Sequence, residues 1–275
     1  MTAPDIRLIA ADMDGTLLDP DGRVPDGFWP LLERLRERGI AFAPASGRQL
    51  ATLQRLFGDA DLDYIAENGT YVVHGGAEVS SDTLHAEFVA SVVGRLRALV
   101  SAGVLRVGVV VCGKRSAYIE STDPHFLAEV HKYYAELRVV DDLLAEDDQV
   151  LKLAVYDFDG GEEHTAPALA DLRATHQVVV SGVHWVDVMN AGVNKGVALS
   201  GLQRALGVTP AQTAAFGDYL NDLEMLAVAD WSYAMAEAHD DVVATARHRA
   251  GSNADAGVVR AIESLLDGGA AGDRQ

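Results

Sequence analysis

The sequence is poor in cysteine, in basic residues and in long apolar runs, and each shortage excludes a class of protein. Cys112 is the only cysteine among 275 residues, so the chain can form neither an intrachain disulfide nor a cysteine-based zinc site. No stretch reaches the roughly 18 consecutive apolar residues of a membrane-spanning helix. The N-terminus carries Asp5, Arg7 and Asp12 around a short apolar patch and is unlike a signal peptide. We therefore expect a cytoplasmic protein with no membrane partner.

The shortage of basic residues limits the partners of the chain. Its 22 Lys and Arg stand against 41 Asp and Glu, which gives a formal net charge of −19. This charge argues against nucleic acid as a partner, because phosphate-backbone binding needs a basic surface. An anionic small molecule would also be repelled unless local cations reverse the field. Hydrophobic residues make up 49% of the chain, which is enough for a folded core.

Both ends of the chain show a strand–helix rhythm. Apolar runs at residues 6–11 and 40–44 predict buried strands, and apolar residues at helical spacing follow each of them. The same rhythm returns from Lys195 onward, with a further strand predicted at residues 213–216. Strands that alternate with helices form parallel sheets through right-handed crossovers. The two ends therefore predict one α/β domain, a Rossmann-like parallel sheet core flanked by helices.

The middle of the chain has a different pattern, in which strands follow one another between fewer helices. Helices are predicted around residues 126–137 and 166–174, among several β-branched runs. Such a pattern is typical of an α+β module. We predict a core domain formed by residues 1–82 and 188–275, interrupted by an inserted α+β domain of residues 83–187.

Polar side chains follow the first two predicted strands of the core. Asp12 and Asp14 leave the first strand two residues apart, and Gly15 lets the backbone turn and approach a ligand closely. One carboxylate can attack while the other handles a proton. Ser46 and Gly47 follow the second strand and open a helix, where a hydroxyl and free backbone N–H groups make an anion site. Alone, each segment also fits a surface turn or a simple helix cap.

Two further segments stand at strand–helix junctions near the C-terminus. Lys195 begins a predicted helix and could offer a point charge to a phosphate. Asp218, Asn221 and Asp222 follow the strand that ends at Phe216, and the two carboxylates suit Mg²⁺. An exposed lysine and an acidic turn are the simpler interpretations of these segments taken singly. All four segments fall at the same type of junction in the parallel module, and that conjunction favours a single site.

With these motifs, the chain resembles the haloacid dehalogenase-like hydrolases, and more closely their Cof-type sugar-phosphatase branch with an inserted α/β (type IIB) cap. The resemblance covers nearly the whole chain, and further segments similar to that branch are Glu67-Asn68-Gly69, residues 217–226 (GDYLNDLEML), Tyr233-Ala234-Met235, Ser252-Asn253 and Gly257-Val258. One departure is Ala236-Glu237, where the family often has Gly-Asn after the Met; this affects a loop near the site. The inserted domain corresponds to the cap, which in this branch closes over the site and selects the leaving group.

The resemblance implies a Mg²⁺-dependent phosphomonoesterase that hydrolyses a small phosphorylated metabolite, such as a sugar phosphate. Asp12 would attack phosphorus and form an aspartyl-phosphate, and Asp14 would protonate the leaving oxygen and later activate water. The Asp12 and Asp218 carboxylates and the Asp14 carbonyl would hold Mg²⁺. Asp222 would support the metal site through water or through Lys195.

The resemblance also implies the groups that hold the phosphoryl oxygens, namely Ser46, the Gly47 amide, Lys195 and Asn221. A phosphomutase that uses the same aspartyl-phosphate, and a catalytically silent phosphate-binding regulatory protein, are the alternative functions. Residues 108–114 match the first part of a nucleotide-binding P-loop, but their β-branched centre is typical of a strand. The sequence does not reveal the substrate or the oligomeric state.

Overall fold

The computed structural model describes residues 4–268, which divide into two compact units. One unit contains the chain up to Ser80 and from Asn194 onward, and the other is Ser81–Val193. The second predicted boundary, between residues 187 and 188, falls inside strand β11 (Trp185–Asn190). Because β11 pairs antiparallel with β9 (Val150–Asp157), the whole strand belongs to the second unit.

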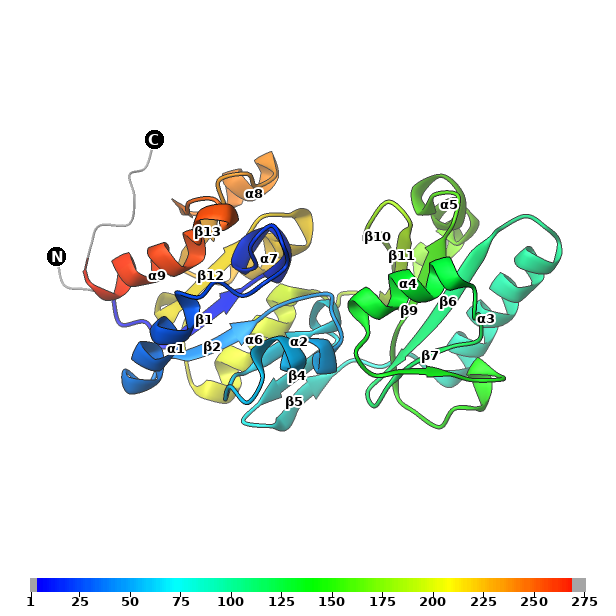
Figure 1. The fold of residues 1–275 in the computed structure, drawn as a ribbon, viewed down its shortest axis with the longest axis horizontal. Coiled ribbons are helices and arrows are strands. Elements are labelled where there is room, and N and C mark those ends of the chain that lie inside the picture. The colour runs from blue at the N-terminus through cyan, green and yellow to red at the C-terminus, as the bar shows by residue number, and fades with distance from the viewer. Residues whose placement is uncertain (1–3, 269–275) are drawn as a thin grey trace. The chain divides into compact units, whose positions relative to one another are not determined.

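The first unit is built on a five-stranded sheet in which every pair of neighbours is parallel (Figure 1). In spatial order its strands are β14 (His248–Arg249), β13 (Trp231–Ala234), β12 (Thr213–Gly217), β1 (Leu8–Ala11) and β2 (Ala41–Pro44). The central strand β1 is fully buried, as its unbroken apolar run predicts.

Helices cover both faces of this sheet. They are α1 (Phe28–Glu37), α2 (Leu50–Phe57), α6 (Lys195–Leu206), α7 (Leu223–Ala227), α8 (Asp240–Thr245) and α9 (Gly257–Leu266). Alternate residues of β1 serve the two faces: Ile9 belongs to the core cluster with α1 and α9, whereas Ala10 belongs to the cluster with α6 and α7. Figure 1 shows α1 beside α9, and the two helices are in contact.

A small second sheet extends the first unit. It consists of β3 (Tyr64–Ala66), β4 (Tyr71–His74) and β5 (Ala77–Ser81), with β3 and β4 antiparallel. A parallel bridge between Ala45 and Ile65 joins β3 to the segment that follows β2. The turn after β3 is thereby held beside the predicted anion-binding loop.

The second unit is a mixed, mostly antiparallel sheet with helices. In spatial order its strands are β10 (His176–Val180), β11, β9, β6 (Val107–Gly113), β7 (Ala117–Ile119) and β8 (Leu137–Val139), and only β7 and β8 pair parallel. Its helices are α3 (Ala86–Ser101), α4 (Pro124–Tyr133) and the short α5 (Ala166–Ala168). Along β9, Val155 packs with the α3 cluster and Ala154 with the α4 cluster.

Strand β6 contains residues 108–113 of the P-loop-like segment, as its β-branched residues predict, and Lys114 follows the strand. Gly108 lies against the ring of Phe126 in α4, where an added Cβ would come within 2.5 Å of the ring. The glycine therefore serves close packing of a helix on a sheet.

Two predicted helices of the second unit were too long. Helix α4 ends because Tyr134 is extended, with φ −122° and ψ 105°, and Leu137 instead pairs with Ala117 of β7. The predicted helix at residues 166–174 is split at Leu169, after which a 3₁₀ segment follows. Among residues 4–268, no helix is both long enough and apolar enough to cross a bilayer.

Candidate active site

The carboxyl ends of neighbouring strands in the first unit carry the predicted site residues other than Lys195, which begins α6 after β11 of the second unit. The last residue of β1 is aligned with Pro44 of β2 and with Phe216 of β12. Asp12 therefore leaves the sheet beside the segments that contain Ser46 and Asp218. In open α/β sheets this edge is where ligands bind.

A buried ion-pair network joins Asp12 to the start of α6. Lys195 is 1% exposed, and its ammonium donates hydrogen bonds to Asp12 Oδ1 and, over 2.7 Å, to Asp222 Oδ1. The helix begins at this lysine because the Asn194 side chain accepts the N–H of Val197 at 2.8 Å and caps the first turn. Three predicted site residues that are far apart in the sequence thus meet in one network.

Burial and crowding of like charges set the protonation of this network. Burial raises the pKa of the Asp12 carboxyl well above its usual range; Lys195 opposes this rise, and Asp222 and Asp218 add to it. Burial lowers the pKa of the Lys195 ammonium, but attraction to Asp12 and Asp222 outweighs it, so this pKa lies above its ordinary value. The cluster holds one ammonium and three carboxyl groups, so acidic groups outnumber basic groups in it.

The two aspartates after β12 have different surroundings. Asp222 is buried; its Oδ1 accepts from Lys195, and its Oδ2 accepts from the backbone N–H groups of Asp218 at 3.1 Å and Tyr219 at 3.3 Å. Asp218 accepts a hydrogen bond from Thr16 Oγ1 at 2.8 Å. Burial raises the pKa of Asp218, against the hydrogen bond from Thr16. Asp222 therefore orients its neighbours, whereas Asp218 has oxygen lone pairs to offer a ligand.

The donor set at this point fits a hard divalent cation. Carboxylate oxygens of Asp12, Asp218 and Asp222 all lie within 4.8 Å of one another. Oxygen donors of this kind suit Mg²⁺, and a cation would relieve the excess of negative charge. The turn is shaped for close approach: Gly15 has φ +79°, and an added Cβ would collide with the Asp218 carboxylate.

Asp14, the predicted acid–base residue, is held by Arg48, for which no role was predicted from the sequence. Arg48 Nε donates to Asp14 Oδ2 at 3.0 Å, and a terminal nitrogen of Arg48 donates to Oδ1 at 2.6 Å. Arg48 directly follows the predicted anion-binding residues Ser46 and Gly47, and this position was the signal that could have identified it.

The predicted anion-binding loop packs against the turn after β3. Ser46 is 2% exposed; its backbone carbonyl accepts the N–H of Asn68 at 2.9 Å, and its Oγ accepts the N–H of Arg48 at 3.2 Å. An added Cβ at Gly47 would come 3.0 Å from Asn68 Oδ1. Asn68 has φ +58°, a conformation that asparagine tolerates better than most residues. Asn68 is thus a neighbour of the loop that residue chemistry alone did not identify.

Asn221, the last predicted phosphate-binding residue, lies on the short 3₁₀ segment Leu220–Asp222. Its side chain is exposed, next to the buried Asp222. Within residues 4–268, its side chain makes no hydrogen bond to Ser46 or Lys195, whose side-chain partners are Arg48, Asp12 and Asp222. The structure therefore places Asn221 beside the cluster without joining it to the network.

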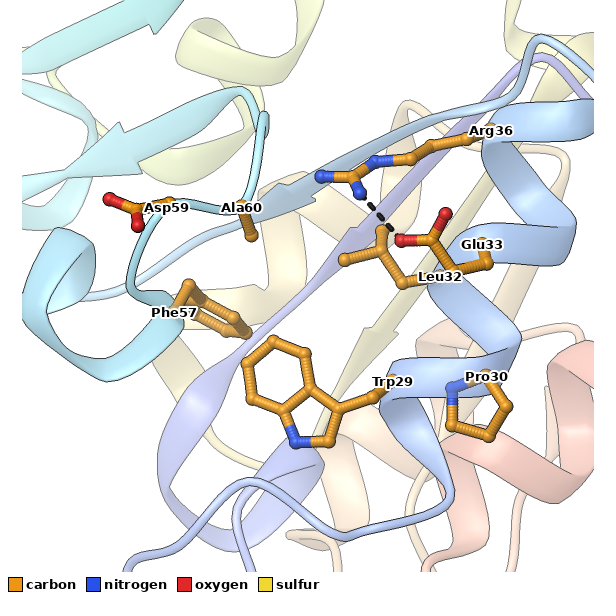
Figure 2. A pocket seen from close by; sticks show the side chains of 8 residues that line it. All are labelled: Trp29, Pro30, Leu32, Glu33, Arg36, Phe57, Asp59 and Ala60. Atoms are coloured by element: carbon orange, nitrogen blue, oxygen red, sulfur yellow. Dashed lines mark hydrogen bonds and ion pairs between the residues drawn. The ribbon is translucent and has the colours of Figure 1, made fainter.

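A pocket of about 460 Å³ lies elsewhere in the first unit, between α1 and the end of α2 (Figure 2). Trp29 and Phe57 form part of its wall, and two charged side chains on it, Glu33 and Arg36, pair with each other at 2.7 Å. None of its lining residues belongs to the predicted site. We assign no chemistry to this pocket.

Fold and site together define an α/β protein with an inserted second unit. At the edge of its parallel sheet lies a cluster of carboxylates that could bind a cation. The family model described as haloacid dehalogenase-like hydrolase matches residues 9–262. The chain therefore belongs to this family.

Comparison with individual proteins agrees with the family. The chain is 34% identical over 266 residues to 5-amino-6-(5-phospho-D-ribitylamino)uracil phosphatase YbjI of Escherichia coli, which covers 95% of this chain and 96% of the relative. It is 30% identical over 248 residues to an HMP-PP phosphatase of Cronobacter sakazakii, with 88% of each chain covered. The crystal structure of SMU.1108c from Streptococcus mutans superimposes with a TM-score of 0.83 at 27% identity, covering 95% of this chain and 99% of that one. The predicted family, fold class and enzyme class, a phosphatase, are confirmed.

Proposed function

We propose that this protein is a Mg²⁺-dependent phosphomonoesterase that hydrolyses a small phosphorylated metabolite, a sugar phosphate or a similar ester, through an aspartyl-phosphate on Asp12. The observation that carries the proposal is the contact between the buried Asp12 and Lys195, with Asp218 beside them. The names of the two relatives reported above also describe phosphatases of small compounds.

Asp12 is the nucleophile of the proposed reaction. Its carboxylate oxygen bonds to phosphorus while the ester P–O bond breaks, and the leaving oxygen takes a proton from the Asp14 carboxyl. A water molecule then attacks the phosphorus of the aspartyl-phosphate and gives one proton to Asp14, while the bond between phosphorus and the Asp12 oxygen breaks. Inorganic phosphate leaves, and the Asp12 carboxylate and the protonated Asp14 are restored.

Asp12, Asp218 and the backbone carbonyl of Asp14 are the groups that would hold Mg²⁺. When bound, the ion would offset the repulsion between a carboxylate nucleophile and a phosphate. Asp222 keeps Lys195 and the backbone of the Asp218 turn in place.

The phosphoryl oxygens would be held by the Ser46 hydroxyl, the Gly47 N–H, Lys195 and Asn221. Lys195 stays protonated at neutral pH because its carboxylate neighbours hold its pKa above the usual range. A fixed ammonium stabilises charge that develops on the transferred group. It also supplies local positive charge, which offsets at the site the repulsion between an anionic substrate and a protein of net charge −19.

The test combines a nucleophile variant with removal of the metal. We expect Asp12→Asn to abolish phosphate release from p-nitrophenyl phosphate and from a panel of phosphorylated metabolites, while circular dichroism stays unchanged. Asp21→Asn, at an exposed aspartate paired with Arg23, is the matched control and should keep full activity. EDTA should stop the wild-type enzyme, and Mg²⁺ should restore it. Substantial activity in Asp12→Asn would refute the nucleophile, and full activity in chelator would refute the metal.

A further inference from the structure

We propose that Arg48 is a positioning residue that fixes the Asp14 carboxylate in its working orientation, through the two-point ion pair between them. This inference rests on the proposed function, in which Asp14 exchanges protons with the leaving group and with water. It assigns to Arg48 an effect on turnover through Asp14, with no contact to the substrate.

The geometry of the pair supplies both position and orientation. Two parallel N–H···O contacts, of 3.0 and 2.6 Å, tie the guanidinium plane to the carboxylate plane. A single donor would fix a distance but would leave the carboxylate free to rotate. Lysine, with its compact ammonium, cannot reproduce this two-point contact.

Packing alone does not hold Asp14. Its side chain is 61% exposed, whereas that of Arg48 is 16% exposed. Its backbone (φ −79°, ψ 123°) lies in the irregular turn before Gly15, outside regular secondary structure. Without a partner, an exposed carboxylate in such a turn samples several rotamers, and the time spent in any one of them falls.

Arg48 itself is anchored at both of its backbone polar groups. Its N–H donates to Ser46 Oγ at 3.2 Å, and its carbonyl accepts the N–H of Glu67 at 3.0 Å. Glu67 is 1% exposed, so this second anchor lies in the core. The arginine thus links the loops after β2 and β3 to the turn after β1.

A second arginine in the chain offers a matched comparison. Arg106 makes the same two-point contact with Asp159, at 3.3 and 2.8 Å, but both side chains are more than half exposed. Exposed pairs of this kind contribute little to stability and constrain their side chains only weakly. The variant Arg106→Met therefore removes an equivalent pair far from the site in sequence and should leave turnover unchanged.

The experiment compares steady-state kinetics of Arg48→Lys, Arg48→Met and Arg106→Met with the wild type in saturating Mg²⁺. The probes are p-nitrophenyl phosphate, the best ester from the metabolite panel, and inorganic phosphate as a competitive inhibitor. We expect kcat to fall about 10-fold or more in both Arg48 variants, because small misplacements of a reacting group cost up to about 100-fold. KM and the inhibition constant of phosphate should stay within about 2-fold of the wild type.

A double-mutant cycle with Asp14→Asn separates positioning from a general structural effect. If Arg48 acts through Asp14, the double variant is no slower than Asp14→Asn alone. Losses that multiply would show that Arg48 acts elsewhere and would overturn the inference. Melting temperatures identify any variant that fails to fold, and if Arg48→Met does so, the cycle is run with Arg48→Lys.

The remaining outcomes tell the two proposals apart. An active wild type with normal kcat in both Arg48 variants overturns the positioning role and leaves the phosphatase intact. A rise in KM and in the phosphate inhibition constant, with kcat unchanged, makes Arg48 a ligand of the phosphate and also overturns the inference. A wild type that is inactive on every ester overturns the proposed function, and the role of Arg48 falls with it.

Discussion

Replacement of the buried Lys195 by methionine tests the electrostatic design of the site without any substrate. Methionine keeps most of the volume of the side chain, so the change removes charge rather than packing. The ammonium donates to two carboxylates, Asp12 and Asp222, and hydrogen bonds to charged groups are worth about 1.5–3 kcal/mol each. Removal of one partner from a buried ion pair costs about 3–5 kcal/mol. We therefore expect Lys195→Met to lose about 3–5 kcal/mol of unfolding free energy at neutral pH.

The pH dependence of this loss has a definite sign. The folded-state pKa of Lys195 lies above its ordinary value, so the stability that it contributes is fully present at neutral pH and is lost only as pH rises through that raised pKa. In the variant, unpaired buried carboxylates disfavour the folded state while they are ionised. As pH falls, the Asp12 carboxyl, whose pKa burial raises, takes up a proton, and the deficit should shrink.

The assay is urea unfolding in EDTA at several pH values between neutral and acid. Lys132→Met is the matched control, because Lys132 pairs with Glu129 on the exposed surface of α4, where solvent screens the pair and its loss should change stability little. Addition of Asp222→Asn to Lys195→Met should recover part of the loss, because it removes one unpaired carboxylate. A variant as stable as the wild type at neutral pH, or a deficit that does not change with pH, would refute the reasoning.

Three further predictions concern single contacts. Burial raises the pKa of Asp218, so the ionised carboxylate destabilises the metal-free fold at pH values above that pKa. Asp218→Asn should therefore raise the melting temperature in EDTA at neutral pH, and this gain should vanish in acid. Gly15→Ala should lower stability by at least about 1–2 kcal/mol, because φ is +79° there, and should weaken Mg²⁺ binding measured by calorimetry, since the new Cβ meets the Asp218 carboxylate. Gly108→Ala should destabilise the second unit by about 1–3 kcal/mol in urea unfolding, because its Cβ meets the Phe126 ring; an unchanged midpoint would contradict this packing.

The regular parts of the fold were readable from local patterns. The buried run of β1 and the helical spacing of α1 depend on neighbours in sequence, and both elements form as predicted. Local patterns failed where a tertiary partner decided the outcome. Leu137 continues the spacing of α4 in sequence, yet it pairs with β7, because the backbone hydrogen bonds of an edge strand were available to it.

The sequence by itself determined which chemical groups stand at the strand ends. Strand–helix junctions are visible in the hydrophobic pattern, and parallel strands end at a common edge, so Asp12, Ser46 and Asp218 could be assigned to one side of the sheet. The identity of the polar residues that follow these strands could therefore be predicted from the local sequence pattern alone. Lys195 follows β11, which belongs to the antiparallel sheet of the second unit, so only the tertiary structure brings it to this edge.

Only the tertiary structure decided how those groups are paired. It gave Lys195 two carboxylate partners, fixed Asp222 as their support, and joined Asp14 to Arg48. Such pairing depends on distances of a few ångströms between segments that can be almost two hundred residues apart, as for Lys195 and Asp12 with a separation of 183 residues. The physical reason is that Coulomb and hydrogen-bond energies depend on distance, angle and burial, which are set by packing of the whole unit and leave no trace in local sequence.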